Sequence, residues 1–230
     1  MKKTSVFTNI TFWLGVLALV VEFIVGYPYF LSTDTFEQEF GQKAIMEGCF
    51  ALVGLLFIDV IRGNKFKLKP EFRKYEFNSL WRGTIILAVL WGTQMITYFL
   101  PMTVSDPQMA LAITFASICE EIFFRGFVLT LFIKAGEIDR NKINLPFTKR
   151  DISVIEIAGI IISSVAFAGI HTNYYNQPSL LIALFLSGVI IGFMFVIWED
   201  LTACIFGHFL LNFIWTVQNY GFWFFGMVNL

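Results

Sequence analysis

The sequence predicts an all-α protein, a polytopic bundle of about seven transmembrane helices, and three observations predict it. Hydrophobic residues make up 57% of the 230 residues and charged residues only 14%, whereas soluble domains carry about 25% charged residues. Apolar runs close to the roughly 20 residues that cross a bilayer recur along the whole chain. The Lys and Arg residues cluster in alternate loops, as they do in multi-pass membrane proteins.

The apolar runs define the predicted helices. They cover residues 10–30, 44–61, 83–100, 109–133, 153–171, 180–198 and 201–217. The first run is too long for the core of a signal peptide, so we expect it to be a retained helix; Glu22 lies in its middle without an obvious partner in the sequence. The tail is too short to span the bilayer as an ordinary helix, although an eighth helix there remains an alternative.

The chain is therefore expected to form a single integral membrane domain over residues 1–230. Within it, the first three helices occupy residues 1–108, a core with chemistry-bearing residues occupies 109–217, and the tail occupies 218–230. The formal net charge of −1 says nothing further about partners. The apolar composition makes the lipid bilayer the expected partner, and we expect no nucleic acid.

Positively charged loops predict the orientation. Of the sixteen Lys and Arg residues, fourteen lie at the N-terminus, in the loop 62–82 or in the loop 134–150, which share one side if seven helices alternate. Cytoplasmic loops carry the excess of Lys and Arg. We expect a multi-pass protein of a prokaryotic plasma membrane, with the N-terminus in the cytoplasm and the tail outside.

The fourth run contains three charged residues, Glu120, Glu121 and Arg125, in the stretch SICEEIFFRG. Each charge near the centre of a membrane helix costs about 2.5–3.5 kcal/mol, so such residues need partners and by default mark a functional site. Glu121 and Arg125 are four residues apart with the acid first, which favours an ion pair. Glu120 is turned about 100° away and is left to face other groups. The alternative is a charge cluster that only fixes helix packing.

Both histidines of the chain fall in or at the end of predicted helices. His171 ends the fifth helix, one turn after Phe167, and His208 lies in the seventh helix with Asn212 one turn on. A carboxylate such as Glu120 and an imidazole can hold a water and remove its proton, while His and Asn donors stabilise an oxyanion. The residues therefore favour water activation.

A metal site is the alternative chemistry. Glu120, His171 and His208 would be the ligands, because two His and a Glu are a known set of catalytic zinc ligands. The HExxH helix motif is absent, so we expect no cofactor and keep a divalent metal as the alternative. The three cysteines lie in separate apolar runs without CxxC spacing, which predicts neither a disulfide framework nor a thiolate cluster. We expect Cys119 to be a packing residue rather than a nucleophile.

Three motifs resemble a known family. EEIFFR at residues 120–125 matches an EExxxR motif, FAGIH at 167–171 matches FxxxH, and HFLLN at 208–212 matches HxxxN, in that order. Over residues 109–217 the chain is similar to the CPBP family of intramembrane endopeptidases, which includes CAAX prenyl proteases and bacteriocin-processing or immunity proteins. The resemblance implies a metal-free protease of the glutamate type that acts on a membrane-associated peptide or protein.

The resemblance also implies a role for each motif residue. Glu120 and His171 would position and activate the attacking water, and His208 and Asn212 would form the oxyanion hole. Glu121, Arg125 and Phe167 would support them.

Straight, parallel helices do not bring these residues to one depth. At 1.5 Å per residue, Glu120 lies about 16 Å from the outer end of its helix, while His208 and His171 lie about 10 Å and about 25 Å from the inner ends of theirs. Either the fifth helix begins as an interfacial stretch near residues 151–156 and tilts, or the last two helices sit unevenly.

Two other functions use the same residues. A non-enzymatic bacteriocin-immunity or scaffold protein would keep them for structure or binding. A proton-coupled transporter would use Glu120, His171 and His208 as a relay, but the repeats and interrupted helices typical of transporters are not visible in the sequence.

Overall fold

The computed structural model describes residues 10–63, 77–97, 107–144, 151–171 and 177–224 of the chain. The helices are α1 (Ile10–Phe30), α2 (Thr35–Gly63), α3 (Phe77–Thr97), α4 (Pro107–Glu121), the π-helix η2 (Ile122–Leu129), α5 (Thr130–Gly136), α6 (Val154–Gly169), α7 (Pro178–Trp198) and α8 (Leu201–Phe224). A short antiparallel hairpin, β1 (Lys142–Asn144) and β2 (Asp151–Ser153), lies in the segment predicted as a polar loop. The all-α class is confirmed for this part of the chain.

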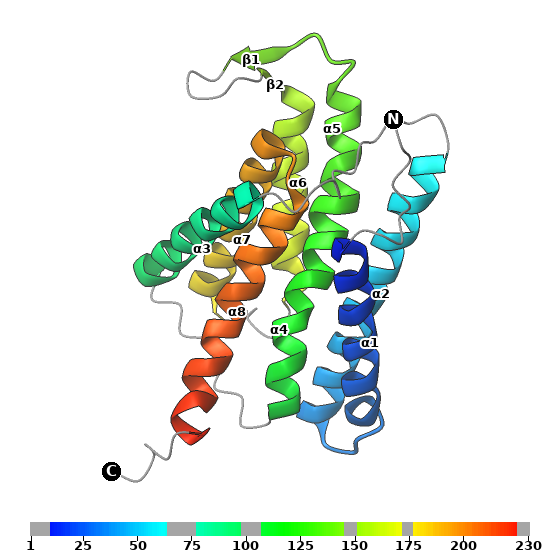
Figure 1. Cartoon of the computed structure of the whole chain (residues 1–230), viewed down its shortest axis with the longest axis vertical. Helices are drawn as coiled ribbons and strands as arrows, with labels where there is room; N and C mark the ends of the chain where they lie inside the picture. The colour runs from blue at the N-terminus through cyan, green and yellow to red at the C-terminus, as the bar shows by residue number, and fades with distance from the viewer. Residues whose placement is uncertain (1–9, 64–76, 98–106, 145–150, 172–176, 225–230) are drawn as a thin grey trace.

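One long helical unit forms the axis of the bundle, running through α4, η2 and α5 without a break (Figure 1). The sequence predicts an α-helix over residues 109–133, and this prediction is wrong for the eight residues of η2. Two backbone carbonyls of the π-helix accept side-chain hydroxyls, that of Phe124 from Ser163 (3.4 Å) and that of Arg125 from Thr130 (2.8 Å). The bond from Ser163 joins two helices, so a pattern of apolar residues along one helix cannot predict it. Single π turns inside α-helices are frequent at functional sites.

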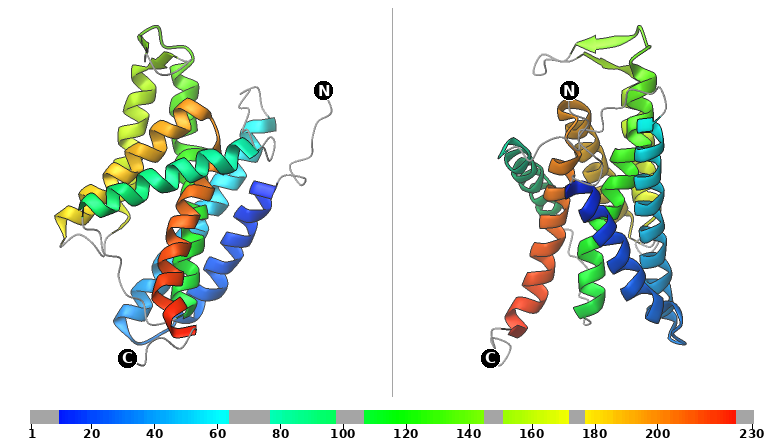
Figure 2. Two further views of the ribbon diagram at one scale, coloured as in Figure 1. Left: turned by 60° about the vertical axis from the view of Figure 1, so that its left-hand side comes forward. Right: turned by 45° about the vertical axis from the view of Figure 1, so that its right-hand side comes forward.

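Two other helices flank different halves of this axis. α6 runs from the hairpin along α5 and η2, whereas α8 runs along α4 in the other half (Figures 1 and 2). The end of α6 and the first turns of α8 therefore meet the axis near its middle. This stagger of α6 and α8 along the axis brings the residues at the end of α6 and in the first turns of α8 together.

The start of α8 is fixed by Asp200, which bonds to α3. One carboxylate oxygen of Asp200 accepts the N–H of Ala203 (3.0 Å), as an N-cap does. The other oxygen accepts the hydroxyl of Ser79 (2.8 Å) and a guanidinium N–H of Arg82 (3.0 Å). These bonds set where along the axis the next residues of α8 lie, and His208 is among them.

The α1–α2 hairpin packs against α4 and η2 on the other side of the axis (Figure 1). α2 begins well before the predicted residue 44. Asp34 caps it, because its Oδ1 accepts the N–H groups of Phe36 (2.9 Å) and Glu37 (3.0 Å). The first turns of α2 are polar, so an apolar run could not predict that the helix begins at Thr35.

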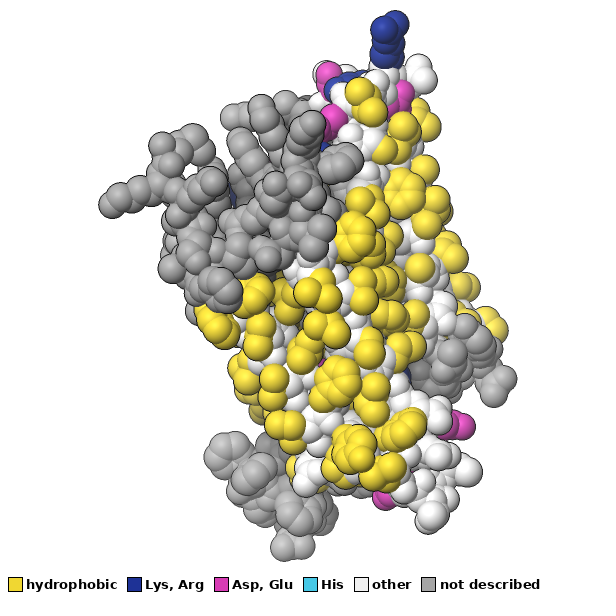
Figure 3. Space-filling view, turned by 90° about the vertical axis from the view of Figure 1, so that its right-hand side faces the viewer, with side chains coloured by type: hydrophobic (Ala, Val, Ile, Leu, Met, Phe, Trp, Pro, Cys, Tyr) yellow, Lys and Arg dark blue, Asp and Glu magenta, His cyan; other side chains and the backbone are white. Residues whose placement is uncertain are grey.

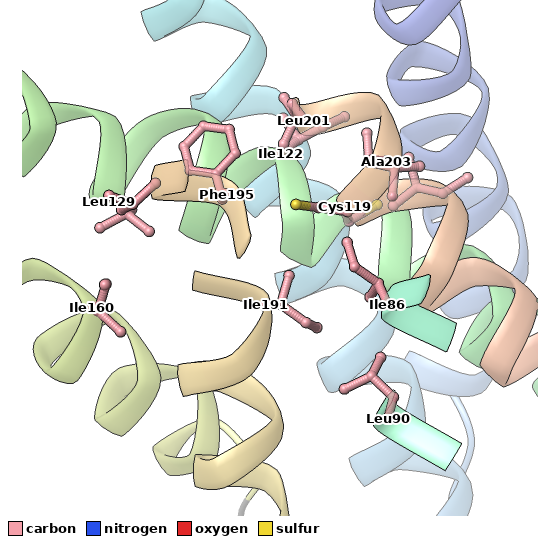
Figure 4. Packing of buried hydrophobic residues seen from close by; sticks show 14 of the residues in the cluster. Ile86, Leu90, Cys119, Ile122, Leu129, Ile160, Ile191, Phe195, Leu201 and Ala203 are labelled. Atoms are coloured by element: carbon pink, nitrogen blue, oxygen red, sulfur yellow. The ribbon is translucent and has the colours of Figure 1, made fainter. Parts of the chain in front are cut away.

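Apolar side chains fill the interior between the helices (Figure 4). Cys119 and Ile122 of the central axis lie among residues of α3, α7 and α8, including Ile86, Ile191 and Ala203. Cys119 has no exposed surface. In this structure it is a packing residue.

Much of the outer surface is also apolar. Figure 3 shows hydrophobic side chains over most of one face, with the charged side chains mainly toward its two ends. Within the part of the chain that the structure describes, three helical segments are long and apolar enough to cross a membrane: Phe12–Phe30, Thr35–Phe57 and Pro178–Trp198. Val154–Gly169 and Leu201–Val217 are shorter apolar helices. These surfaces and lengths point to a membrane protein.

Candidate active site

The three charged residues of the fourth predicted helix lie inside the bundle. Glu121 and Arg125 have no exposed surface, and Glu120 is 3% exposed. As the spacing predicts, Arg125 Nη1 donates to Glu121 Oε1 at 3.1 Å. Burial of this kind makes each partner depend on the other, since an uncompensated charge in the interior is strongly destabilising.

Arg125 also joins α7 and α6 to the axis. Its Nη2 donates to the carbonyl of Gly188 in α7 at 3.2 Å, and its guanidinium lies 5.0 Å from the ring centre of Phe167 in α6. The second contact is a cation–π interaction. Arg125 therefore holds three helices in register around the site.

Glu121 has a second partner that the sequence did not predict. His208 Nδ1 lies 2.9 Å from Glu121 Oε1, the same oxygen that Arg125 contacts. Because an ionised carboxylate only accepts hydrogen bonds, Nδ1 carries the hydrogen. Glu121 thereby fixes the tautomer and the orientation of the His208 ring.

His171 is held in a similar way from its own helix. It follows the end of α6, and its Nδ1 lies 2.8 Å from the backbone carbonyl of Phe167. A carbonyl oxygen only accepts, so this nitrogen is again the one that carries the hydrogen. The ring of Phe167 contacts both imidazoles, with ring centres 5.1 Å from His171 and 5.9 Å from His208.

Both oriented rings turn their Nε2 atoms toward Glu120. His171 Nε2 lies 3.6 Å from Glu120 Oε1, and His208 Nε2 lies 3.9 Å from Glu120 Oε2. These distances are longer than a direct hydrogen bond, which is typically 2.7–3.2 Å. The structure thus brings three of the predicted site residues together at the middle of the axis.

Asn212 lies one turn beyond His208 and faces α4. Its Nδ2 donates to the backbone carbonyl of Ile113 at 3.0 Å. A side-chain amide has two N–H groups, so this bond uses one donor and leaves the other for a further acceptor.

The chemistry that the cluster can perform depends on which ring nitrogens carry a hydrogen. With Nδ1 protonated on a neutral His171 ring, its Nε2 atom and the carboxylate of Glu120 are both acceptors. Acceptors that face one another need a hydrogen donor or a cation between them. A water that donates to Glu120 and to one imidazole satisfies this arrangement and is placed to lose a proton.

No group of three His, Cys, Asp or Glu side chains within the described ranges is arranged to hold a metal ion. Ligand histidines in metal sites also donate their second ring N–H to a carboxylate or a carbonyl, as His208 and His171 do here. The metal-free mechanism therefore stays a prediction.

Residues 102–214 match the model of the family described as type II CAAX prenyl endopeptidase, Rce1-like. The match contains all seven motif residues, from Glu120 to Asn212. Over these residues the chain belongs to the CAAX protease family. The resemblance predicted from the three motifs is thereby confirmed, and membership supports a protease that acts in a membrane. Comparison with curated proteins and with solved structures gives no match.

One residue that supports the candidate site was not predicted from the sequence. Gly188 supplies the carbonyl that Arg125 contacts, and a Cβ at this position would lie 3.0 Å from Cβ of Ser164 in α6. With Gly192 it forms a GxxxG pattern, which is typical of closely packed membrane helices. That pattern was the available signal.

Proposed function

We propose that this CAAX protease family member is an intramembrane endopeptidase that hydrolyses a peptide bond of a membrane-associated peptide or protein. The observation that carries the proposal is the convergence of Glu120 with the Nε2 atoms of His171 and His208 inside an apolar bundle. A cluster that served only packing would bring donors and acceptors together. Here two acceptors, the Glu120 carboxylate and His171 Nε2, face one another at 3.6 Å, which suits a reactant that supplies hydrogens.

In the proposed reaction Glu120 and His171 hold the attacking water. As the water oxygen bonds to the peptide carbonyl carbon, Glu120 accepts the proton that the water loses. When the C–N bond breaks, that proton passes to the leaving amine, so Glu120 returns to its starting state. The products are one peptide with a new carboxyl end and one with a new amino end.

In this proposal His208 and Asn212 stabilise the oxyanion of the tetrahedral intermediate by donating hydrogen bonds to it. His208 Nδ1 is already bonded to Glu121, so a donor at Nε2 requires the imidazolium form, which the carboxylate of Glu121 stabilises. Asn212 donates through the N–H that Ile113 does not use. Donors placed where negative charge develops commonly supply several kcal/mol of transition-state stabilisation.

Comparative peptidomics of cells that carry the wild-type chain, Glu120→Gln or Glu39→Gln tests the proposal. Glu39 is exposed on α2 and serves as a matched control for loss of one carboxylate. We expect cleavage products that disappear in Glu120→Gln and persist in Glu39→Gln, and the missing products identify the substrate. Products that persist in both variants would favour the immunity or scaffold function instead.

The proposed location is the plasma membrane of a prokaryote, with the N-terminus and the loop 62–82 in the cytoplasm. It rests on the distribution of Lys and Arg in the sequence. Cysteines introduced at Asn64 and Asn173, which lie outside the described residues, should be labelled by an impermeant reagent from opposite sides. Labelling of position 64 from outside would reverse the proposed orientation.

A further inference from the structure

Two further carboxyl groups lie beside the site, on the α1–α2 hairpin. Glu22 of α1 has no exposed surface and Glu47 of α2 is 4% exposed. Both oxygens of Glu22 lack a hydrogen-bond partner among the described residues. Glu22 packs against α2 next to Gly48, where an added methyl group would lie 3.4 Å from the Glu22 Cβ.

These carboxyl groups form one electrostatic cluster with Glu120. Glu22, Glu47 and Glu120 are all buried on α1, α2 and α4, three helices that pack against one another, and are near enough for their charges to interact. On this side of the site the described cation is Lys43, whose Nζ lies 3.6 Å from Glu47 Oε1. Arg125 is directly paired with Glu121.

Three ionised carboxylates and one ammonium group leave two negative charges without a partner. Buried like charges strongly oppose one another's ionisation, so the cluster is stable only when it holds protons. Glu47 has Lys43 beside it, and Glu120 faces the two histidines. Among the described residues Glu22 has no direct contact of either kind, so its ionised form is the most costly of the three.

We propose that Glu22 is a proton-holding carboxyl of the active site, which keeps its own proton and leaves the negative charge on Glu120. It acts through Glu120 and is therefore a positioning residue. In the cleavage step the proton of the water passes to Glu120 and then to the leaving amine, while Glu22 retains its proton throughout. The inference rests on the proposed endopeptidase function, but one of its tests does not depend on cleavage.

Infrared spectroscopy of the purified chain in lipid measures the proton directly. The C=O stretch of a protonated carboxylic acid is separate from the bands of a carboxylate. We expect the wild-type chain to show such a band and Glu22→Gln to lose it, while Glu39→Gln keeps it. An unchanged band in Glu22→Gln overturns the inference, whether or not the protein proves to be a peptidase.

Kinetics then separate positioning from packing. Glu22→Leu fills the same apolar space without a polar group, so a packing role predicts full activity and equal or higher thermal stability. We expect instead that kcat falls by about 10–100-fold with KM little changed, as when a reacting group is misplaced. Glu22→Gln, which stays neutral and can still donate, should recover most of that kcat. Equal losses in Leu and Gln variants, or none in either, contradict the inference, and Glu22→Met replaces Glu22→Leu if the latter does not accumulate.

Discussion

The adjacent residues Glu120 and Glu121 are chemically identical and occupy opposite situations. Glu121 Oε1 binds Arg125 at 3.1 Å and His208 at 2.9 Å, and Arg125 continues to Gly188 and Phe167. Glu120 has no contact of that length to its two histidines, which stand at 3.6 and 3.9 Å. Glu121 has two direct partners within the protein, both at its Oε1 atom, whereas Glu120 faces the two imidazoles at longer distances.

The difference follows from helix geometry. Consecutive residues of a helix point about 100° apart, so one of the two glutamates faces Arg125 and α8 while the other faces the end of α6. The pair thus separates two tasks that a single carboxylate performs poorly. Glu121 compensates the buried charge of Arg125 and orients the ring of His208, which leaves Glu120 for the proton transfer that we propose.

The largest effect is expected from Glu120→Gln. Gln keeps the shape of the side chain but cannot accept the proton, so kcat should fall by about 10²–10⁴-fold. No ion pair is lost, so membrane abundance and melting temperature should stay near the wild-type values. An active Glu120→Gln protein, or one that is as unstable as Glu121→Gln, contradicts the role assigned to Glu120.

Glu121→Gln should damage the fold as well as the activity. Removing one partner of a buried ion pair costs about 3–5 kcal/mol, because Arg125 is left uncompensated. The measurements are melting temperature and abundance in membranes. The double variant Glu121→Gln with Arg125→Met leaves no lone charge and should be more stable than either single variant; failure of that recovery would show that the pair is not the source of the loss.

Gly188→Ala should lower the melting temperature by less than Glu121→Gln does. It should also disturb the site, because the Gly188 carbonyl accepts a hydrogen bond from Arg125. The added Cβ would meet Ser164 at 3.0–3.2 Å, and overpacking of this kind costs about 1–3 kcal/mol. The control is Gly92→Ala in α3, where a Cβ meets nothing within 4 Å and Ala is favoured over Gly in a helix by about 0.8–1.0 kcal/mol. A melting temperature that falls equally in both variants would contradict the packing role of Gly188.

Predictability from sequence also differed between the two glutamates. The Glu121–Arg125 pair was predictable because both residues lie on one helix, where spacing alone sets the contact. The Glu121–His208 bond was not, because it depends on where α8 begins along the axis, and Asp200 sets that through Ser79 and Arg82.

The same distinction applies to the fold. The bounds of α1 were predicted to the residue, since a continuous apolar run is a local signal. The π-helix η2 was not predicted, because an apolar run does not distinguish π from α winding and the bond from Ser163 to the Phe124 carbonyl comes from another helix. The site residues were found by motif, whereas the stagger that brings α6 and α8 to the middle of the axis is a property of packing.

The smallest effect is expected from chelators. The second ring nitrogen of His171 and of His208 is held by an acceptor, as it would be beside either a bound water or a metal, but the described side chains are not arranged as a metal site. The sequence lacks HExxH and thiolate-cluster patterns, so we expect cleavage by the purified protein in lipid to be unchanged by EDTA or phenanthroline. Metal analysis of the same sample should find less than one zinc per chain. Loss of cleavage with a chelator and its return with zinc, but not with magnesium, would make Glu120, His171 and His208 ligands, and Glu121 would then orient a metal-bound imidazole.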